Sequence, residues 1–110
     1  VMANTFKVKT FDGSSTAANA AMNIYTDPAS TTTVVIGLTI SNTTSSQITV
    51  DIKLSAASTV FLAKDIPIPV GSSFEYMAGN KIIMEATHTL SVASDAANSA
   101  DTALSIMEIT

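Results

Sequence analysis

The 110-residue sequence contains no cysteine and no tryptophan, and all five of its basic residues are lysines. Without cysteine there is neither a disulfide framework nor a zinc–thiolate site, and thiol redox chemistry is excluded. The net charge is −4. A chain with this charge and no arginine lacks the clustered basic surface and the forked donors that nucleic-acid binding draws on. The sequence therefore argues against a redox protein and against direct nucleic-acid binding.

Charge of either sign is scarce. Only 13% of the residues are charged, against about 25% in an average soluble domain, whereas serine and threonine together occupy 30 positions. Two interpretations fit this composition: a β protein coated with Ser and Thr, or a protein whose surface is partly covered by copies or partners. The length supports one domain with a single core, over residues 2–110.

Long hydrophobic runs are also missing. No run approaches the roughly 20 apolar residues that a membrane span requires. The N-terminal residues do not show the basic-then-apolar order of a signal peptide. The sequence thus predicts a soluble protein that is not exported and does not contact a membrane.

Alternation of apolar and polar residues is the dominant pattern that is present. In QITVDIKLS, over 47–55, the residues Ile48, Val50, Ile52 and Leu54 can share one face of a strand. The segment TTTVVIGLTIS, over 31–41, is rich in β-branched residues, which favour strands. We expect these two segments to pair as a hairpin that joins their apolar rows into one face. Further strands are expected around 6–10, 22–25, 60–62, 74–76, 82–84, 90–92 and 104–109.

Prolines and turns add to this pattern. Pro67 and Pro69 alternate with apolar residues over 66–70, and because a proline cannot donate to a strand ladder, this piece is expected at an edge or in an extended crossover. A second hairpin is expected from 74–76 and 82–84, around the turn Ala78-Gly79-Asn80. Eight or nine short strands predict an all-β fold, a single antiparallel β-sandwich of immunoglobulin-like or jelly-roll type.

Residues that carry chemistry are few. His88 is the only histidine, and no Gly-x-Ser-x-Gly turn accompanies a serine. The Glu85-x-x-His88 spacing suits metal ligands on a helix but not on a strand and turn. The oxygen-rich loop with Asp95, Asn98 and Asp101 lacks the glycine and glutamate of a calcium-hand loop. The sequence predicts no catalytic residue, no metal ligand and no cofactor, and therefore not an enzyme.

Several phrases together resemble a known class of protein. They are MANTFKVKT near the start, IYTDPASTTTVVIGLTISNTTSSQITVDIKL, IPIPVGSSFEY, and ALSIMEIT at the end. Across nearly the whole chain these phrases resemble small virion structural proteins of tailed bacteriophages, many of them from cyanophages. The resemblance implies a β-sandwich building block of the virion, made in the host cytoplasm. It implies a capsid decoration or cement protein on the phage head, with a tail, neck or fibre accessory domain as the alternative.

The resemblance also implies partners. These are the major capsid protein or other virion proteins, and identical copies, with a trimer at a local threefold axis as the expected form. A β-sandwich with little charge and protected edges suits a protein that adds interface area between capsid subunits. Residues expected at an interface are those of an N-terminal arm within 2–6, namely Ala3, Asn4, Thr5 and Phe6, followed by Pro67, Pro69 and the loop 94–101.

A carbohydrate-binding or host-surface-binding module is a rival from another class, because β-sandwiches carry lectin-like sites on their loops. Such a site usually offers an exposed aromatic ring. Phe61, Phe74 and Tyr76 are expected in strands that face the core, whereas Phe11 and Tyr25 lie near turns and are candidate contact residues.

Overall fold

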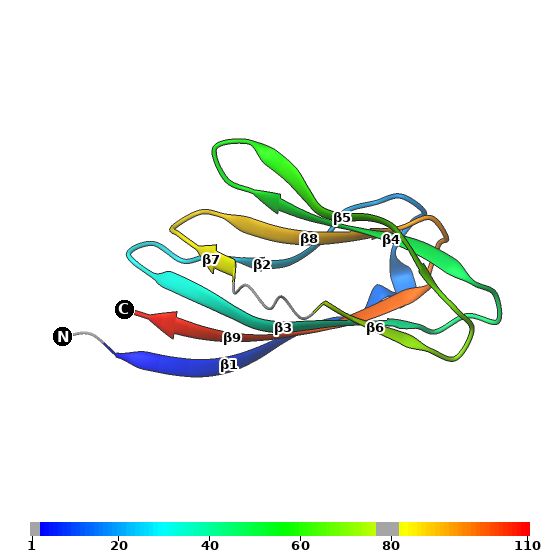
Figure 1. Cartoon of the computed structure of the whole chain (residues 1–110), viewed down its shortest axis with the longest axis horizontal. Helices are drawn as coiled ribbons and strands as arrows, with labels where there is room; N and C mark the ends of the chain where they lie inside the picture. The colour runs from blue at the N-terminus through cyan, green and yellow to red at the C-terminus, as the bar shows by residue number, and fades with distance from the viewer. Residues whose placement is uncertain (1–2, 77–81) are drawn as a thin grey trace.

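The chain folds as a sandwich of two antiparallel β-sheets. The computed structural model describes residues 3–76 and 82–110, and Figure 1 shows the two layers with both chain ends at the same end of the molecule. The molecule is elongated, with extents of 48 × 26 × 25 Å. In the residues described, no helix is long or apolar enough to span a bilayer.

In the described part of the chain, the first sheet has five strands and the second has four. The first sheet has the order β1-β9-β3-β6, and β7 also pairs with β3; the second has the order β2-β8-β4-β5. The chain therefore alternates between the layers from β1 to β4, which is the strand arrangement of a jelly roll. The strand bounds are β1 Asn4–Phe11, β2 Met22–Thr26, β3 Thr32–Asn42, β4 Ile48–Ser55, β5 Thr59–Ile68, β6 Ser73–Tyr76, β7 Ile82–Met84, β8 Thr89–Ser94 and β9 Ala100–Ile109.

The predicted fold class is confirmed, and the jelly-roll alternative is the correct one. Nine strands form within residues 3–76 and 82–110, and each expected segment contains one. Alternation holds best in β9, where every second residue from Ala100 to Glu108 is buried and the residues between them are exposed or, at Met107, half-buried. The inner faces of the two sheets pack against each other and form the core. Its largest fully buried members are Met22, Leu38, Ile40, Ile48, Ile52, Ile68, Met84, Leu90, Leu104 and Ile106.

Both expected hairpins are wrong. β3 lies in the first sheet and β4 in the second, so their apolar rows face each other across the core instead of lying side by side. β6 and β7 do not pair with each other; both pair with β3, over Leu38–Ser41 and Thr33–Val35 respectively. The turn expected at 78–80 lies outside the described residues. The expected apolar face is buried in β4, but in β3 a register shift between Val35 and Gly37 places Val34 on the outer face, opposite in direction to Leu38 and Ile40.

The segment with the prolines lies where the sequence predicts. β5 is an edge strand of the second sheet, and Pro67 stands opposite Thr49 of β4. On the other side of Thr49, its carbonyl oxygen accepts from the Asp95 N–H and its own N–H donates to Oδ1 of Asp95. Because backbone groups alternate in direction along a strand, the missing N–H of Pro67 is on the open edge of the sheet. Pro67 therefore removes a donor that would otherwise be unpaired.

A short 3₁₀ turn, η1 (Gly13–Ser15), connects the first sheet to β2. Asp12 caps it, and its Oδ1 accepts a hydrogen bond of 2.9 Å from the Ser14 N–H. The Cα of Gly13 packs so closely on β9 that an added Cβ would lie 1.8 Å from the Ala100 carbonyl oxygen. Only glycine fits at this point.

Candidate functional site

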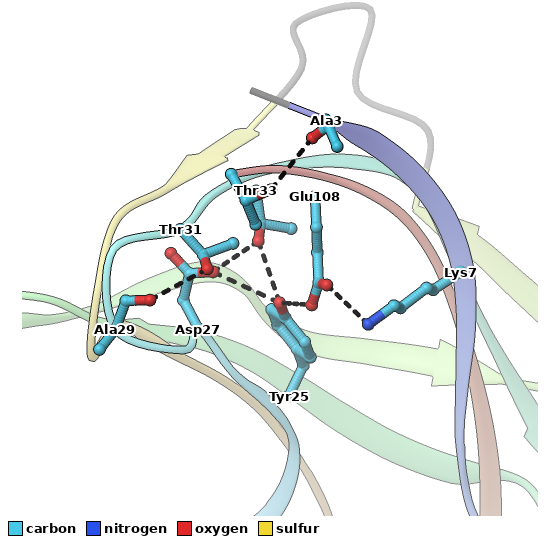
Figure 2. A network of polar contacts seen from close by, with 9 residues as sticks. Ala3, Lys7, Tyr25, Asp27, Ala29, Thr31, Thr33 and Glu108 are labelled. Carbon is cyan, nitrogen blue, oxygen red and sulfur yellow. Dashed lines mark hydrogen bonds and ion pairs between the residues drawn. The ribbon is translucent and has the colours of Figure 1, made fainter. Parts of the chain in front are cut away.

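A group of polar side chains, buried except for that of Lys7, lies between the two sheets near the start of β1 and the end of β9 (Figure 2). Tyr25 donates its hydroxyl to Oε2 of Glu108, whose Oε1 lies 2.7 Å from Nζ of Lys7. Thr33 donates a hydrogen bond of 2.5 Å to Oδ1 of Asp27, and its own hydroxyl oxygen lies 3.0 Å from that of Tyr25. These five residues, Lys7, Tyr25, Asp27, Thr33 and Glu108, form the inter-sheet polar cluster.

Two local features bring these side chains together. In β2 the register with β8 shifts between Asn23 and Tyr25, so the consecutive residues Ile24 and Tyr25 are both buried. In β9, Glu108 continues the inward row of Leu104 and Ile106. Glu108 lies two residues after Ile106, at the same alternating spacing as the apolar row. This spacing was the one sequence signal for the cluster, and sequence analysis missed it.

Within the cluster, the carboxylate of Glu108 is matched by the Lys7 ammonium and the Tyr25 hydroxyl. The hydrogen bonds from Lys7 and then from Tyr25 hold the pKa of Glu108 below its ordinary value. Burial, followed by the hydrogen bond to Glu108, raises the pKa of Tyr25 well above its ordinary value. Tyr25 is therefore a protonated donor and Glu108 a charged acceptor over the neutral range. Both oxygens of Glu108 are occupied by protein donors, and the cluster joins the two sheets.

Asp27 is fixed in this cluster by its backbone. Its N–H donates to the carbonyl oxygen of His88 at 2.9 Å, and its carbonyl oxygen accepts from the N–H of Thr87 at 3.0 Å. Within the described residues, its buried Oδ2 has no hydrogen-bond partner. A buried acceptor without a donor is costly, so Asp27 weakens what the rest of the cluster contributes.

The residues considered as metal ligands are engaged elsewhere. His88 accepts the Glu85 N–H on Nδ1 at 3.1 Å, within a turn between β7 and β8. Asp95 accepts the Thr49 N–H and Asp101 accepts the Gly13 N–H, at 2.9 and 3.0 Å, so the two carboxylates hold different segments. Within residues 3–76 and 82–110, no group of three or more His, Cys, Asp or Glu is placed to hold a metal ion.

An open depression of about 390 Å³ lies near the start of η1. Its two acids, Asp12 and Asp101, both accept backbone N–H groups of η1, and the hydrogen bonds from Ser14 lower the pKa of Asp12. These carboxylates therefore stabilise the turn. The lining residues are Thr10, Phe11, Asp12, Thr39, Ser41, Asp101, Thr102 and Ala103.

The structure places the expected interface residues in different environments. Asn4, Thr5 and Phe6 belong to β1, and Ala3 exchanges two backbone hydrogen bonds of 3.0 Å with Thr110. This segment is therefore a strand and not an arm, although it is exposed; Met2 lies outside the described residues. Pro67 and Pro69 are exposed, at the end of β5 and just beyond it.

The aromatic residues differ from the expectation. Tyr25 is buried and Phe11 is half-buried against the core, so neither offers an open ring. Phe61, expected in the core, is 50% exposed. The ammonium groups of Lys53 and Lys64 lie 5.1 and 4.9 Å from the centre of its ring, within the range of a cation–π contact.

An apolar row crosses the outer face of the first sheet, and the sequence did not reveal it. Phe6 of β1 stands opposite Met107 of β9, which stands opposite Val34 of β3, which stands opposite Ile83 of β7. Residues directly opposite in antiparallel strands share a face. Phe6 is 73% and Ile83 52% exposed. We call these four residues the outer apolar row.

The comparisons with known proteins show a fold and no family. No family model matches the sequence, and no curated protein matches it. Solved structures do match. A chain of the acid-stable capsid of Helicobacter pylori bacteriophage KHP30 has a TM-score of 0.57 and 10% identity, covering 97% of this chain and 87% of that one.

Two further structures have the same sandwich. A chain of the Bacillus endospore appendages, described as disulfide-linked pili, has a TM-score of 0.52 and 16% identity over 98% of this chain and 86% of that one. A chain of infectious bursal disease virus, Gx strain, has a TM-score of 0.53 and 12% identity over 96% of this chain and 33% of that one. The structural neighbours are thus viral capsid proteins and a pilus protein.

Proposed function

We propose that this protein is a non-enzymatic structural subunit of a bacteriophage virion, and that it acts as a decoration or cement protein bound between capsid subunits. The observation that carries the proposal is the outer apolar row. A soluble domain does not usually keep large apolar side chains in line across four strands of a solvent-facing sheet. A contact with other virion proteins would cover them.

The surroundings of the row support this proposal. Next to Phe6 on the same face of β1 is Val8, which is 64% exposed, and Val8 stands opposite Ser105 of β9. Lys7 and Lys9 alternate with these residues and belong to the other face of β1. The central part of the outer face is therefore apolar or hydroxyl-bearing, which suits the core of a protein–protein interface.

The jelly-roll neighbours and the resemblance of the sequence to phage virion proteins point to the same class. The KHP30 neighbour belongs to a phage capsid. The pilus neighbour belongs to a disulfide-linked family, and this chain has no cysteine, so linkage of that kind is not open to it. A tail, neck or fibre position remains the alternative placement within a virion.

The carbohydrate-binding rival gains no support. Its first candidate residue, Tyr25, is committed to Glu108 inside the sandwich. Its second, Phe11, packs against the core. Without an open aromatic ring on the loops, the usual platform for a sugar is missing from the residues considered.

The proposal is tested by co-expression with the major capsid protein encoded in the same phage genome, followed by sedimentation of the shells. We expect the chain to sediment with the shells and to raise the temperature at which they dissociate. Ile83→Lys places a charge in the outer apolar row and should weaken attachment by about tenfold or more. Val70→Lys is the matched control, because Val70 is 54% exposed and outside the row.

If Ile83→Lys and Val70→Lys attach to the shells equally well, the outer apolar row is not the contact surface. Shells that carry none of the wild-type chain would overturn the decoration role itself.

A further inference from the structure

The sandwich has four edge strands or edge positions, and three of them are interrupted. β2 has five residues and a bulge, and β5 carries Pro67, two register shifts and Asp65 at a φ of 55°. β6 and β7 have four and three residues. Short strands, bulges, prolines and lysines are among the devices by which proteins limit pairing at a sheet edge. Of these, β1 carries only lysines, Lys7 and Lys9.

β1 is the exception among the described strands. It has eight residues, contains no proline, and pairs with β9 in an unbroken register from Asn4 to Phe11. Its other side faces no strand, since β1 ends the order of the first sheet. Figure 1 shows β1 along the outer margin of its layer. A long, regular, exposed edge is a template for pairing with another strand.

The free backbone groups of this edge can be assigned. Ala3 exchanges both backbone hydrogen bonds with Thr110, so the odd-numbered residues of β1 bond to β9. The N–H and C=O groups of the even-numbered residues, Asn4, Phe6, Val8 and Thr10, therefore point to the open edge. Two of these four residues are the exposed apolar ones, Phe6 and Val8.

We propose that the β1 edge is a self-association site, at which β1 pairs antiparallel with β1 of a second copy of this chain about a twofold axis. The pair makes one continuous sheet of the two five-stranded sheets. It satisfies the free backbone groups of both copies at once, which is the isologous form of contact. The outer apolar rows of the two copies then become one surface.

The side chains of β1 are self-complementary in this arrangement. A register that pairs Phe6 with Val8 of the second copy places an aromatic and a β-branched residue opposite each other twice, a favourable cross-strand pair. The lysines of β1 belong to the other face. Lys7, which lies at the twofold axis in this register, already has its charge paired with Glu108 at 2.7 Å, so repulsion between the two copies is reduced.

A second copy is the occupant that the geometry favours. A trimer, the form implied by the resemblance, needs β1 to contact a different surface of its neighbour. The other edges of the sandwich are the interrupted ones, so the regular strand best able to pair with β1 is another β1. Pairing of copies uses the β1 edge and attachment to a capsid uses the outer face, and Phe6 is the residue that the two surfaces share.

The test is native mass spectrometry of the wild type, Val8→Lys and Val60→Lys at a series of protein concentrations. Val60→Lys is the matched control: Val60 is also a β-branched edge residue and 49% exposed, but it lies on β5. We expect dimers for the wild type and for Val60→Lys, and an increase of at least tenfold in the dimer dissociation constant for Val8→Lys. Circular dichroism checks that each variant is folded.

Amide hydrogen exchange gives an independent readout on the unaltered protein. The Phe6 and Val8 amides should exchange more slowly in the dimer than in the monomer present on dilution, whereas the Lys7 and Lys9 amides, bonded to β9, should change little. A wild-type monomer or trimer at every concentration would overturn the proposal. A dimer that is insensitive to Val8→Lys, or whose Phe6 and Val8 amides are unprotected, would do so equally.

The outcome is separable from that of the proposed function. If the protein is a dimer that does not bind shells, the decoration role is wrong and the β1 edge contact stands. If it is a monomer that binds shells, the decoration role stands and the edge contact is wrong. Ile83→Lys, on β7 at the far side of the sheet, should not change the dimer.

Discussion

At the scale of single residues, Tyr25 and Glu108 connect the two layers directly, through a hydrogen bond between β2 and β9. They are 83 positions apart in the chain, and their protonation states support each other. Lys7 extends the connection to the edge strand β1. The cluster therefore links the core to the strand for which we propose an assembly role.

Tyr25→Phe should lower the free energy of unfolding by about 1.5–3 kcal/mol, because it removes a hydrogen bond to a charged group and leaves a buried oxygen of Glu108 without its donor. Tyr76→Phe is the control: the same change at a half-buried residue of β6 should cost less than about 0.5 kcal/mol. Urea unfolding of the three proteins measures both values. Equal effects of the two substitutions would show that the Tyr25 hydroxyl contributes nothing.

The pKa of Glu108 is lowered in the folded state, so its contribution to stability is complete above its unfolded value of 4.5. The contribution is lost as the pH falls through the lower, folded value. The stability difference between wild type and Glu108→Gln should therefore be constant from neutral pH down to about 4.5 and shrink in more acidic solution. Urea midpoints across this range measure it. A difference that stays constant into acid would contradict the pairing with Lys7 and Tyr25.

The pKa of Tyr25 is shifted in the opposite direction from that of Glu108, and its effect on stability is seen at alkaline pH. Its pKa is raised in the folded state, so its contribution is present below its unfolded value of 10.0 and is lost as the pH rises through the higher, folded value. The Tyr25→Phe variant lacks this ionisable group. Its free energy of unfolding should therefore fall less between neutral and alkaline pH than that of the wild type. Tyrosinate absorbance of the wild type should show one of its two tyrosines titrating only on unfolding.

At the scale of elements, the strands could be predicted and their pairing could not. Local alternation, as in Ile48, Val50 and Ile52, determines which side of a strand is buried, but not which neighbour buries it. A polar loop after β3 allows either a hairpin or a crossing to the other sheet, and the crossing is what occurs. The polar cluster and the outer apolar row depend on that long-range pairing, so neither was predicted.

Pro67 shows an element property that the sequence did predict. Its ring replaces an N–H on the open edge of β5. Pro67→Thr restores that donor without removing a bond to β4, and we expect folding to be retained while soluble aggregates increase with concentration. Light scattering at matched concentrations, beside Thr59→Val on the same strand, measures this. An unchanged scattering signal would show that the proline does not protect the edge.

At the scale of the whole molecule, the few charged residues are unevenly distributed over the surface. The two faces of the sandwich differ: the outer face of the first sheet carries the apolar row, whereas Lys53, Lys64 and Asp65 belong to the hairpin of β4 and β5 in the second. The outer face of the first sheet also carries Glu75 and Asp101, on the strands β6 and β9, so its apolar part is the region around the row. A molecule with such an apolar region and one regular open edge is suited to assembly. The jelly-roll neighbours in capsids and in a pilus share the fold in which such surfaces occur.

The most direct test of the central claim, that this chain is a structural subunit attached to a phage capsid through the outer apolar row, is the amount of chain that sediments with co-expressed shells. The account predicts that wild type and Val70→Lys sediment with the shells in equal amounts and that Ile83→Lys stays largely in the supernatant. Shells that bind none of the three, or all three equally, would contradict it.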